Sequence, residues 1–261
     1  MKKLSLLFLS VAVCAFVGCK DPDEPKPTPD PDPVEPVSAE FTKQIVDGGF
    51  ESCWYSQEMT DETYLEYKSS VFYTLNNLHA LIEVPDLMLT SSPITAYRDE
   101  DAHSGNYCMK LVTGVLTDQS KGRLLIPGAI APLDPNFVYQ FLTPAEYPDG
   151  INVKREYHEK PDRLKGYFKY APVAGDSASV SVKLYNGSDV IGEGLFVEYN
   201  TVGSWTNFEV PITYASNVTP THISIIISAS AGYNFADLTH CQGQEGSTLW
   251  IDDLEFTFPA K

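Results

Sequence analysis

Past residue 40, hydrophobic and polar residues alternate with a period of two in a series of short runs. In Ser179–Tyr185, valine and leucine alternate with serine and lysine, and the same pattern recurs in Asn207–Tyr214 and His222–Ser228. A period of two places the apolar side chains on one face, so these runs predict β-strands that bury one side. The other predicted strands are Tyr107–Thr113, Gly122–Ile126, Leu164–Tyr170, Val190–Glu198 and Ser247–Phe258.

A few segments depart from the period of two. Phe137–Leu142 is mostly apolar on both faces, which predicts a central strand covered on both sides. Glu58–Ser70 and Asn76–Ile82 are the stretches whose pattern allows a helix. Turn-forming residues separate the predicted strands at short intervals. Many strands with almost no helix predict an all-β fold, specifically a jelly-roll β-sandwich.

The first 18 residues have a different pattern. Two lysines follow Met1, and residues 4–17 are apolar except for Ser5 and Ser10. This run is shorter than the ~20 apolar residues of a membrane-spanning helix, and its basic start is typical of a secretory signal. It ends in Phe16-Val17-Gly18-Cys19, which resembles the lipobox of bacterial lipoproteins. We therefore expect Cys19 to be lipidated; the alternative is an ordinary signal peptide with an incidental cysteine.

Residues 19–39 combine proline with acidic residues. Prolines recur from Pro22 to Pro36, and such chain favours an extended, semi-rigid conformation of ~3.1 Å per residue. The acidic run that follows Cys19 resembles the export signal of surface lipoproteins in some Gram-negative bacteria. We expect a lipid anchor in the outer membrane and exposure on the cell surface; a tether facing the periplasm is the alternative. The predicted parts are a signal peptide (1–18), a lipidated tether (19–39) and a β-sandwich domain (40–261).

The composition narrows the classes of partner. The 261 residues are 43% hydrophobic, which is enough for a real core, and the formal net charge is −17. So acidic a surface argues against nucleic acid or anionic lipid as a partner and suits neutral ligands and divalent cations. Three cysteines besides Cys19 remain after the leader (Cys53, Cys108 and Cys241), and they form either one disulfide or buried free thiols.

Two segments near the ends of the predicted domain carry a family resemblance. Val46–Trp54 (VDGGFESCW) and Gly246–Phe256 (GSTLWIDDLEF) resemble the first and last strands of galactose-binding-like jelly rolls, which include many carbohydrate-binding modules. Lys160–Tyr170 (KPDRLKGYFKY) and Ser228–Phe256 resemble the carbohydrate metabolism domain abbreviated PCMD, found in surface lipoproteins of anaerobic Gram-negative bacteria. Phe168 stands where a tyrosine is commoner. The resemblance implies sugar handling without a particular reaction.

The last predicted strand changes phase at Asp252–Asp253, as a β-bulge allows. A bulge would let Asp252 reach Glu51, and two carboxylates that point together repel unless a proton or a cation lies between them. The jelly-roll resemblance implies a structural Ca²⁺ here, with further oxygens from the loop 98–105. The alternative is that these carboxylates hold turns by accepting backbone N–H groups. The predicted metal ligands are Glu51, Asp99, Asp101 and Asp252.

Sugar recognition pairs aromatic faces with planar polar groups. Tyr167, between Lys165 and Lys169 on the polar side of its predicted strand, is one candidate platform; an aromatic residue on a solvated sheet face is the alternative. Trp205 is expected in the core. The remaining predicted sugar-binding residues are Trp54, Tyr73, Asn76, Asn77, Tyr97 and Arg98.

Signatures of catalysis are weak. The sequence contains no Gly-x-Ser-x-Gly, no phosphate-binding loop and no His-Glu-x-x-His pattern, and its 35 acidic residues nominate no catalytic pair. We therefore expect a surface lipoprotein that captures an oligo- or polysaccharide without catalysis. The first alternative is a structural, adhesive or uptake-complex subunit that binds protein. The second is a glycoside hydrolase or lyase.

Overall fold

The computed structural model describes residues 43–58, 63–83, 89–119, 122–134, 136–143, 145–147, 150–232 and 242–259. All of them belong to the compact unit Pro36–Lys261. The predicted signal peptide, Cys19 and the tether lie outside the described residues, as does Cys241. Within the described ranges, no helix has the length and apolar character needed to cross a membrane.

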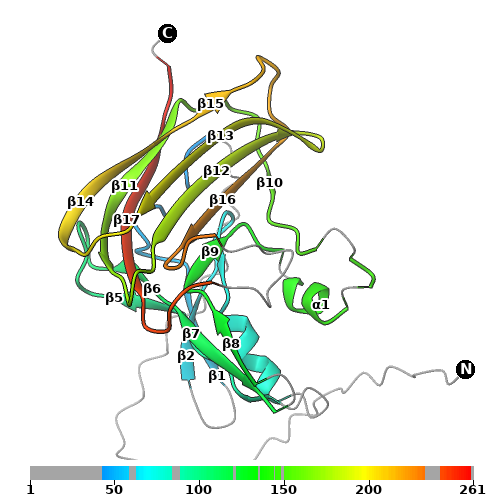
Figure 1. The fold of residues 1–261 in the computed structure, drawn as a ribbon. Coiled ribbons are helices and arrows are strands. Elements are labelled where there is room, and N and C mark those ends of the chain that lie inside the picture. The colour runs from blue at the N-terminus through cyan, green and yellow to red at the C-terminus, as the bar shows by residue number, and fades with distance from the viewer. Residues whose placement is uncertain are drawn as a thin grey trace, which may run out of the picture. The chain divides into compact units, whose positions relative to one another are not determined.

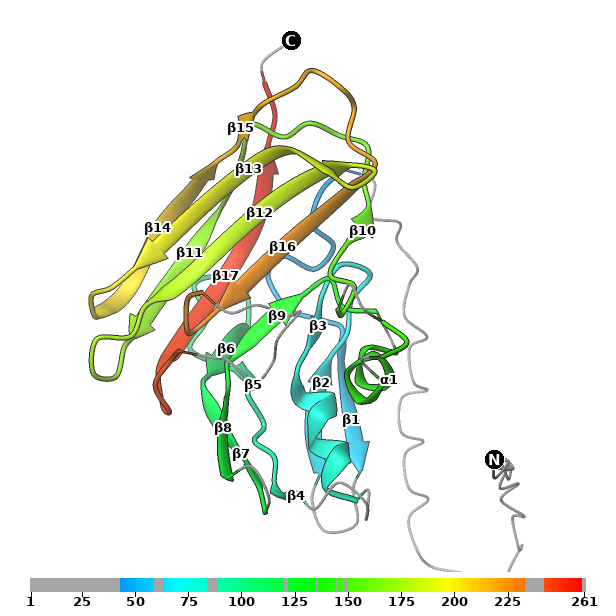
Figure 2. The same ribbon diagram turned by 45° about the vertical axis from the view of Figure 1, so that its right-hand side comes forward.

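Two antiparallel sheets, one in front of the other in Figures 1 and 2, make up most of this unit. The seven-stranded sheet has the order β15-β13-β12-β16-β9-β3, with β10 pairing β16. Its strands are β3 (Tyr73–Thr74), β9 (Ala129–Ala131), β10 (Arg155–Glu156), β12 (Ala178–Asn186), β13 (Asp189–Glu198), β15 (Thr213–Tyr214) and β16 (His222–Ser228).

The five-stranded sheet has the order β14-β11-β17-β6-β5. Its strands are β5 (Ala96–Asp99), β6 (Cys108–Val112), β11 (Arg163–Ala171), β14 (Val202–Pro211) and β17 (Thr248–Thr257). From β11 to β17 the chain passes back and forth between the two sheets, as a jelly roll does. The predicted all-β jelly-roll sandwich is confirmed.

Smaller elements stand beside the sandwich (Figure 2). A three-stranded sheet contains β4 (Leu89–Ser91), β7 (Gly114–Asp118) and β8 (Gly122–Ile126), and β1 (Trp54–Glu58) pairs with β2 (Thr63–Tyr67) as a hairpin. The helical elements of the described ranges are the 3₁₀ helix η1 (Asn76–Glu83) and the α-helix α1 (Phe137–Leu142).

The main core lies between the two sheets. Val180, Val182 and Leu184 of β12 are buried against the inward side chains of β11, among them Leu164 and Phe168. Because successive strand residues point to opposite faces, the intervening polar residues of the same strands form the outer faces of the sandwich. Each sheet therefore presents one outer face, and the candidate sites lie on these two faces.

Two predictions of local structure are wrong. Phe137–Leu142 is the helix α1: Phe137 is buried in a second, smaller core, whereas Tyr139 is 51% exposed, so only one side of the segment is covered. An apolar run of six residues cannot by itself distinguish a helix from a strand. Within Glu58–Ser70, residues 63–67 form β2, because they pair with β1 along its whole length.

Candidate functional site

A groove of 1310 Å³ lies on the outer face of the seven-stranded sheet. Strands β12, β13 and β16 form its floor, and the segment 150–154 forms a wall. Its lining side chains come mainly from Tyr147, Asn152, Val153, Lys154, Ser179, Ser181, Lys183, Tyr185, Glu193, Leu195, Val197, Thr213, Ser224, Ile226 and Ser228.

The alternation of β12 produces the floor. Ser179, Ser181, Lys183 and Tyr185 face outward because the valines and leucine between them fill the core. The neighbouring strands continue the pattern: Ser179 lies opposite Ser228 of β16, and Ser181 lies opposite Leu195 of β13 and Ile226 of β16. Serine side chains are short, so the centre of the sheet stays low while longer side chains rise around it.

The wall is fixed by contacts to the rest of the unit. The backbone N–H of Asn152 donates to Gln140 Oε1 (3.1 Å), and the Arg155 guanidinium donates to the carbonyl of Pro132 (3.0 Å). Lys154 reaches over the groove, with its Nζ 4.0 Å from the centre of the Tyr185 ring. These contacts hold one side of the groove in place without a ligand.

The lining provides what a saccharide needs. Tyr147 and Tyr185 offer aromatic surface, Leu195 is 65% exposed opposite Ser181, and the serines offer hydroxyl groups. Pyranose rings present both C–H faces and hydroxyls, so a mixture of aromatic, apolar and hydroxyl groups suits them. Among the described residues that line the groove, Glu193 is the only carboxylate.

Sequence reasoning did not select any residue of this groove. The signal that could have found it is serine on the outward side of two strands, Ser179 and Ser181 on one and Ser224 and Ser228, with Ile226 between them, on the other. Within a single strand, this pattern indicates only the solvated side of a sheet. What makes it a groove is the wall at 150–154, whose position no local pattern indicates.

The outer face of the five-stranded sheet is built differently. Tyr97, Lys110, Trp250 and Lys169 lie side by side on the neighbouring strands β5, β6, β17 and β11. Lys169 is 8% exposed, with its Nζ 5.1 Å from the Trp250 ring and 4.7 Å from the ring of Trp205. Trp205, which was expected in the core, is half-buried against this outer face.

The predicted platform Tyr167 lies on the same face and is partly covered. The ring of His103 stacks on it, with 3.5 Å between centroids and 12° between planes, and His103 Nδ1 lies 2.6 Å from Asp253 Oδ2. Beside Tyr167 is a depression of 450 Å³, where Lys165 forms an ion pair of 2.6 Å with Glu255. One face of this aromatic ring is therefore already occupied by the protein.

Tyr97 and Arg98 lie in β5 and are exposed. The Tyr97 hydroxyl donates to the carbonyl of Ile94 (2.7 Å), and the Arg98 guanidinium lies 4.2 Å from the centre of the Tyr107 ring. Both side chains are accessible, but neither lines the groove on the opposite sheet.

The other predicted sugar-binding residues do not come together with these. Asn76 is fully buried: its Oδ1 accepts the N–H of Thr95 (2.9 Å) and its Nδ2 donates to the carbonyl of Ala96 (2.7 Å). Asn77, next to it in η1, is half-buried. Asn76 therefore holds η1 against the start of β5.

The aromatic candidates Trp54 and Tyr73 also make contacts inside the unit. Trp54 Nε1 donates to the carbonyl of Phe50 (2.8 Å), and its ring meets Tyr67 edge to face at 5.1 Å. Tyr73 is 8% exposed, with the charged ends of Lys68 and Arg155 near its ring. The rings of Trp54 and Tyr73 therefore pack within the unit and offer little surface to a ligand.

The predicted bulge at Asp252–Asp253 is confirmed. The pairing of β17 with β11 shifts register between Lys165 and Tyr167, and Asp253 has a φ of 52°. Asp252, fully buried, turns its carboxylate toward the loop between β5 and β6, where Oδ2 accepts the N–H groups of His103 (2.8 Å) and Ser104 (3.2 Å). The bulge thus aims a carboxylate at a loop backbone.

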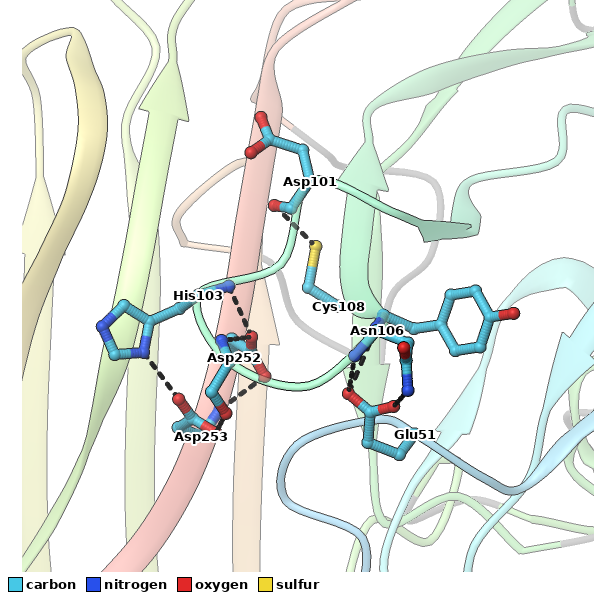
Figure 3. Close-up of polar contacts among 9 residues, drawn as sticks. Glu51, Asp101, His103, Asn106, Cys108, Asp252 and Asp253 are labelled. Atoms are coloured by element: carbon cyan, nitrogen blue, oxygen red, sulfur yellow. Dashed lines mark hydrogen bonds and ion pairs between the residues drawn. The ribbon is translucent and has the colours of Figure 1, made fainter.

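Glu51 holds the other end of this loop. Its Oε1 accepts the backbone N–H groups of Asn106 (2.8 Å) and Tyr107 (3.1 Å). Figure 3 shows His103 beside Asp252 and Asp253 on one side of the loop, and Asn106 beside Glu51 on the other. We call this arrangement, Glu51 with Asp252 and Asp253 around the loop 99–107, the carboxylate clamp.

The clamp bears on the predicted Ca²⁺ site. Its carboxylate oxygens face N–H and O–H donors instead of a shared centre, and Asp101 points away from Asp252 toward Lys169. Asp99 accepts the N–H of Asp101 (2.9 Å). Among the described residues, no group of three or more His, Cys, Asp or Glu is placed to hold a metal ion. The geometry fits the alternative of turn-holding carboxylates better than a cation, and calcium stays a prediction.

Burial affects the protonation of Asp252. Removal from water raises the pKa of its carboxyl to about 6, although the N–H groups of Ser104 and His103 favour the charged form and oppose that rise. Near pH 7 the carboxyl is therefore mostly ionised, which is the form that accepts the loop N–H groups.

A second buried carboxyl lies in the β1–β2 hairpin. Glu66 is 1% exposed; its Oε1 accepts the Thr74 hydroxyl (2.7 Å), while its Oε2 has no partner among the described residues. Burial raises the pKa of Glu66 to about 8, so it is mostly neutral near pH 7. A raised pKa is a mark of catalytic acids, but a carboxyl this enclosed beside Thr74 is better explained as a link between hairpin and sandwich.

The two described cysteines, Cys53 and Cys108, are free thiols. Burial raises the pKa of each, to about 12 for Cys108. A thiol that stays protonated is unreactive, so these residues act as small packing groups, one of the two alternatives that the sequence left open.

No protein-family model matches the sequence, and no curated protein matches it. Solved structures do resemble the fold. One is a protein of Bacteroides vulgatus described as a "putative glycoside hydrolase", with a TM-score of 0.60 and 17% identity over 83% of this chain and 98% of that one. Another, from Bacteroides thetaiotaomicron and described in the same words, has a TM-score of 0.56 and 15% identity over 80% of this chain and 72% of that one.

A family 16 carbohydrate-binding module has a TM-score of 0.35 and 10% identity over 64% of this chain and 87% of that one. A likeness at that level does not bear on function. At 17% and 15% identity, the two Bacteroides proteins show that this chain shares their fold, a jelly-roll β-sandwich.

Proposed function

We propose that this protein is a cell-surface lipoprotein whose jelly-roll domain captures a glycan chain in the groove of the seven-stranded sheet, without catalysis. The observation that carries the proposal is the groove itself: a low serine floor on β12 and β16, flanked by Tyr147 and Tyr185. Ligand sites are concave and mostly apolar, with a few placed polar groups, and this lining has that composition.

The dimensions favour a chain over a single sugar. The outward residues of β12 from Ser179 to Tyr185 all line the groove, and six residue steps of a strand span about 20 Å. The groove follows β12 over that length. An oligosaccharide lying along the strand would contact the serines of the floor and one or both tyrosines.

Binding explains the lining better than hydrolysis does. The two Bacteroides proteins of the same fold are each described as a "putative glycoside hydrolase", so hydrolysis has to be considered for this groove. Hydrolysis of a glycosidic bond uses two carboxyl groups across the substrate. Glu193 is the single carboxylate among the described residues of the groove. Release of reducing sugar from a bound polysaccharide would overturn this part of the proposal.

The anchor is proposed from the sequence. Cys19 would carry the lipid, and the proline- and acid-rich tether 19–39 would hold the domain away from the outer membrane. Metabolic labelling with a fatty acid tests it. We expect label on the intact chain and none on Cys19→Ser, and protease treatment of whole cells should remove the domain if it faces the medium.

A glycan array with the protein tests the binding function. We expect binding to at least one glycan chain, and at least a tenfold loss of affinity for Tyr185→Ala. Tyr167→Ala, on the opposite outer face, is the matched aromatic control and should bind like the parent. Loss of binding in Tyr167→Ala alone would move the site to the five-stranded sheet, and no binding to any glycan would favour a protein partner.

A further inference from the structure

Charge is distributed unusually in the groove. The chain has 35 acidic and 18 basic residues, yet the charged residues among the described lining are Lys154, Lys183 and Glu193. The groove therefore carries a small excess of positive charge in a strongly negative protein. The sign of the charge in the groove is thus opposite to that of the whole protein, and the overall composition does not explain this difference.

Lys154 and Lys183 are both neighbours of Tyr185. Lys183 and Tyr185 are two residues apart on the outer face of β12, so their side chains are neighbours, and Lys154 Nζ lies 4.0 Å from the centre of the Tyr185 ring. The cation–π contact leaves N–H donors of the Lys154 ammonium available to a further acceptor.

Within the described ranges, neither lysine has an acidic partner. Among the described residues, no carboxylate lies within 4.0 Å of either ammonium, although Glu193 occupies the position opposite Lys183 on β13. On the outer face of the five-stranded sheet, by contrast, Lys165 pairs with Glu255, Arg163 with Glu209 and Lys110 with Asp99. Two ammonium groups left without a partner beside an aromatic ring form a subsite suited to an anionic group on a sugar.

We propose that the Tyr185 end of the groove selects a saccharide that carries an anionic substituent, a uronate carboxylate or a sulfate ester. The sugar ring stacks on Tyr185, and its anionic group accepts hydrogen bonds from Lys154 and Lys183. Glu193 opposes this binding by repulsion and limits it to one charge at that position. The proposal rests on the glycan-binding function above and adds the class of glycan to it.

The test compares matched ligands. Binding of the protein is measured to pectate, alginate and hyaluronan, each beside its carboxyl-reduced form, and to a sulfated galactan beside its desulfated form. We expect at least one acidic polysaccharide to bind at least tenfold more tightly than its neutral counterpart, and its affinity to fall with rising ionic strength. The uronate and sulfate arms distinguish the two sources of charge.

Variants give effects of opposite sign. Lys183→Gln and Lys154→Gln should each weaken binding of the acidic form severalfold and leave the neutral form unchanged, whereas Glu193→Gln should strengthen binding of the acidic form. Arg123→Gln, which removes one exposed cation paired with Glu245 outside the groove, is the control. Because Lys183 is exposed, its variant should fold even if Lys154→Gln does not.

The outcomes separate this inference from the function on which it rests. Equal binding of acidic and neutral forms, or binding of neutral glycans alone, would overturn the anionic subsite while leaving glycan capture intact. An unchanged acidic affinity in both lysine variants would also overturn it. Failure to bind any glycan, acidic or neutral, would overturn both proposals.

Discussion

On the outer face of the five-stranded sheet, Lys110, Arg163 and Lys165 form ion pairs with carboxylates, whereas Lys154 and Lys183 on the outer face of the seven-stranded sheet form none with the described residues. The first face also carries the carboxylate clamp and the stacked pair of His103 and Tyr167. The second has a low serine floor between taller side chains.

This difference between the two outer faces shows how a structural role can be distinguished from a binding role when two surfaces have similar residue types. Both faces offer aromatic rings, lysines and carboxylates. On one, these groups satisfy each other and fix a loop, so few are available to a ligand. On the other, hydroxyls, ammonium groups and apolar side chains face an open groove. Pairing within the protein, more than residue type, therefore marks the candidate site.

Removal of the clamp should have the largest effect on stability. Asp252→Ala would leave the N–H groups of His103 and Ser104 without their acceptor, and we expect a loss of roughly 2–3 kcal/mol in the free energy of unfolding. Urea denaturation measures it. Glu193→Gln, which removes a carboxylate from the groove face, should change stability by less than about 0.5 kcal/mol. Equal losses of unfolding free energy in the two variants would contradict the assignment of a structural role to the clamp face alone.

The pH dependence of stability should reflect the two buried carboxyls. The folded pKa of Glu66 is raised to about 8, so between its unfolded value and pH 8 the folded state holds more protons and stability falls as the pH rises. Asp252 contributes in the same direction up to about pH 6.

One titrating proton gives a slope of at most about 1.4 kcal/mol per pH unit. Glu66→Gln should flatten the slope between pH 6 and pH 8, where Asp252 has already titrated. Thermal unfolding across that range measures it. A slope that survives the substitution would assign the effect to another group.

Filling the floor of the groove should abolish binding without harming the fold. Ser181→Tyr adds a large outward side chain at the centre of β12, and tyrosine is well accepted in strands. We expect at least a tenfold loss of glycan affinity with an unfolding free energy within about 0.5 kcal/mol of the parent. A parent-like affinity would show that the glycan binds elsewhere.

Chelation should have the smallest effect. In the clamp, Glu51 and Asp252 accept hydrogen bonds from backbone N–H groups. If these bonds, and no cation, hold the loop, EDTA should leave the melting temperature unchanged. A fall in melting temperature that added Ca²⁺ reverses would instead support the calcium prediction.

The sequence predicts the fold better than the site, for a physical reason. Alternation in β12, β14 and β16 reports directly which face is buried, and the phase change at Asp252–Asp253 reports the bulge, because both are local properties of one strand. α1 was missed because its burial comes from a second core that its own six residues do not specify.

The candidate site depends on relations between distant segments. Tyr167 was chosen as an accessible ring, but His103, sixty-four positions away, covers one of its faces. Asn76 was chosen for its amide, and backbone groups near Thr95 use that amide instead. The groove requires β12, β16 and the wall at 150–154 together. Residue type and spacing along one strand contain none of this information.

The position of β17 has a consequence for how the domain assembles. It is the last of the described strands in the sequence, yet it lies between β11 and β6 in the middle of its sheet. Until β17 is synthesised, no strand connects β11 to β6, and the edge of each that β17 will cover stays open. A nascent chain must therefore keep this half of the sandwich unassembled until β17 itself is available to pair.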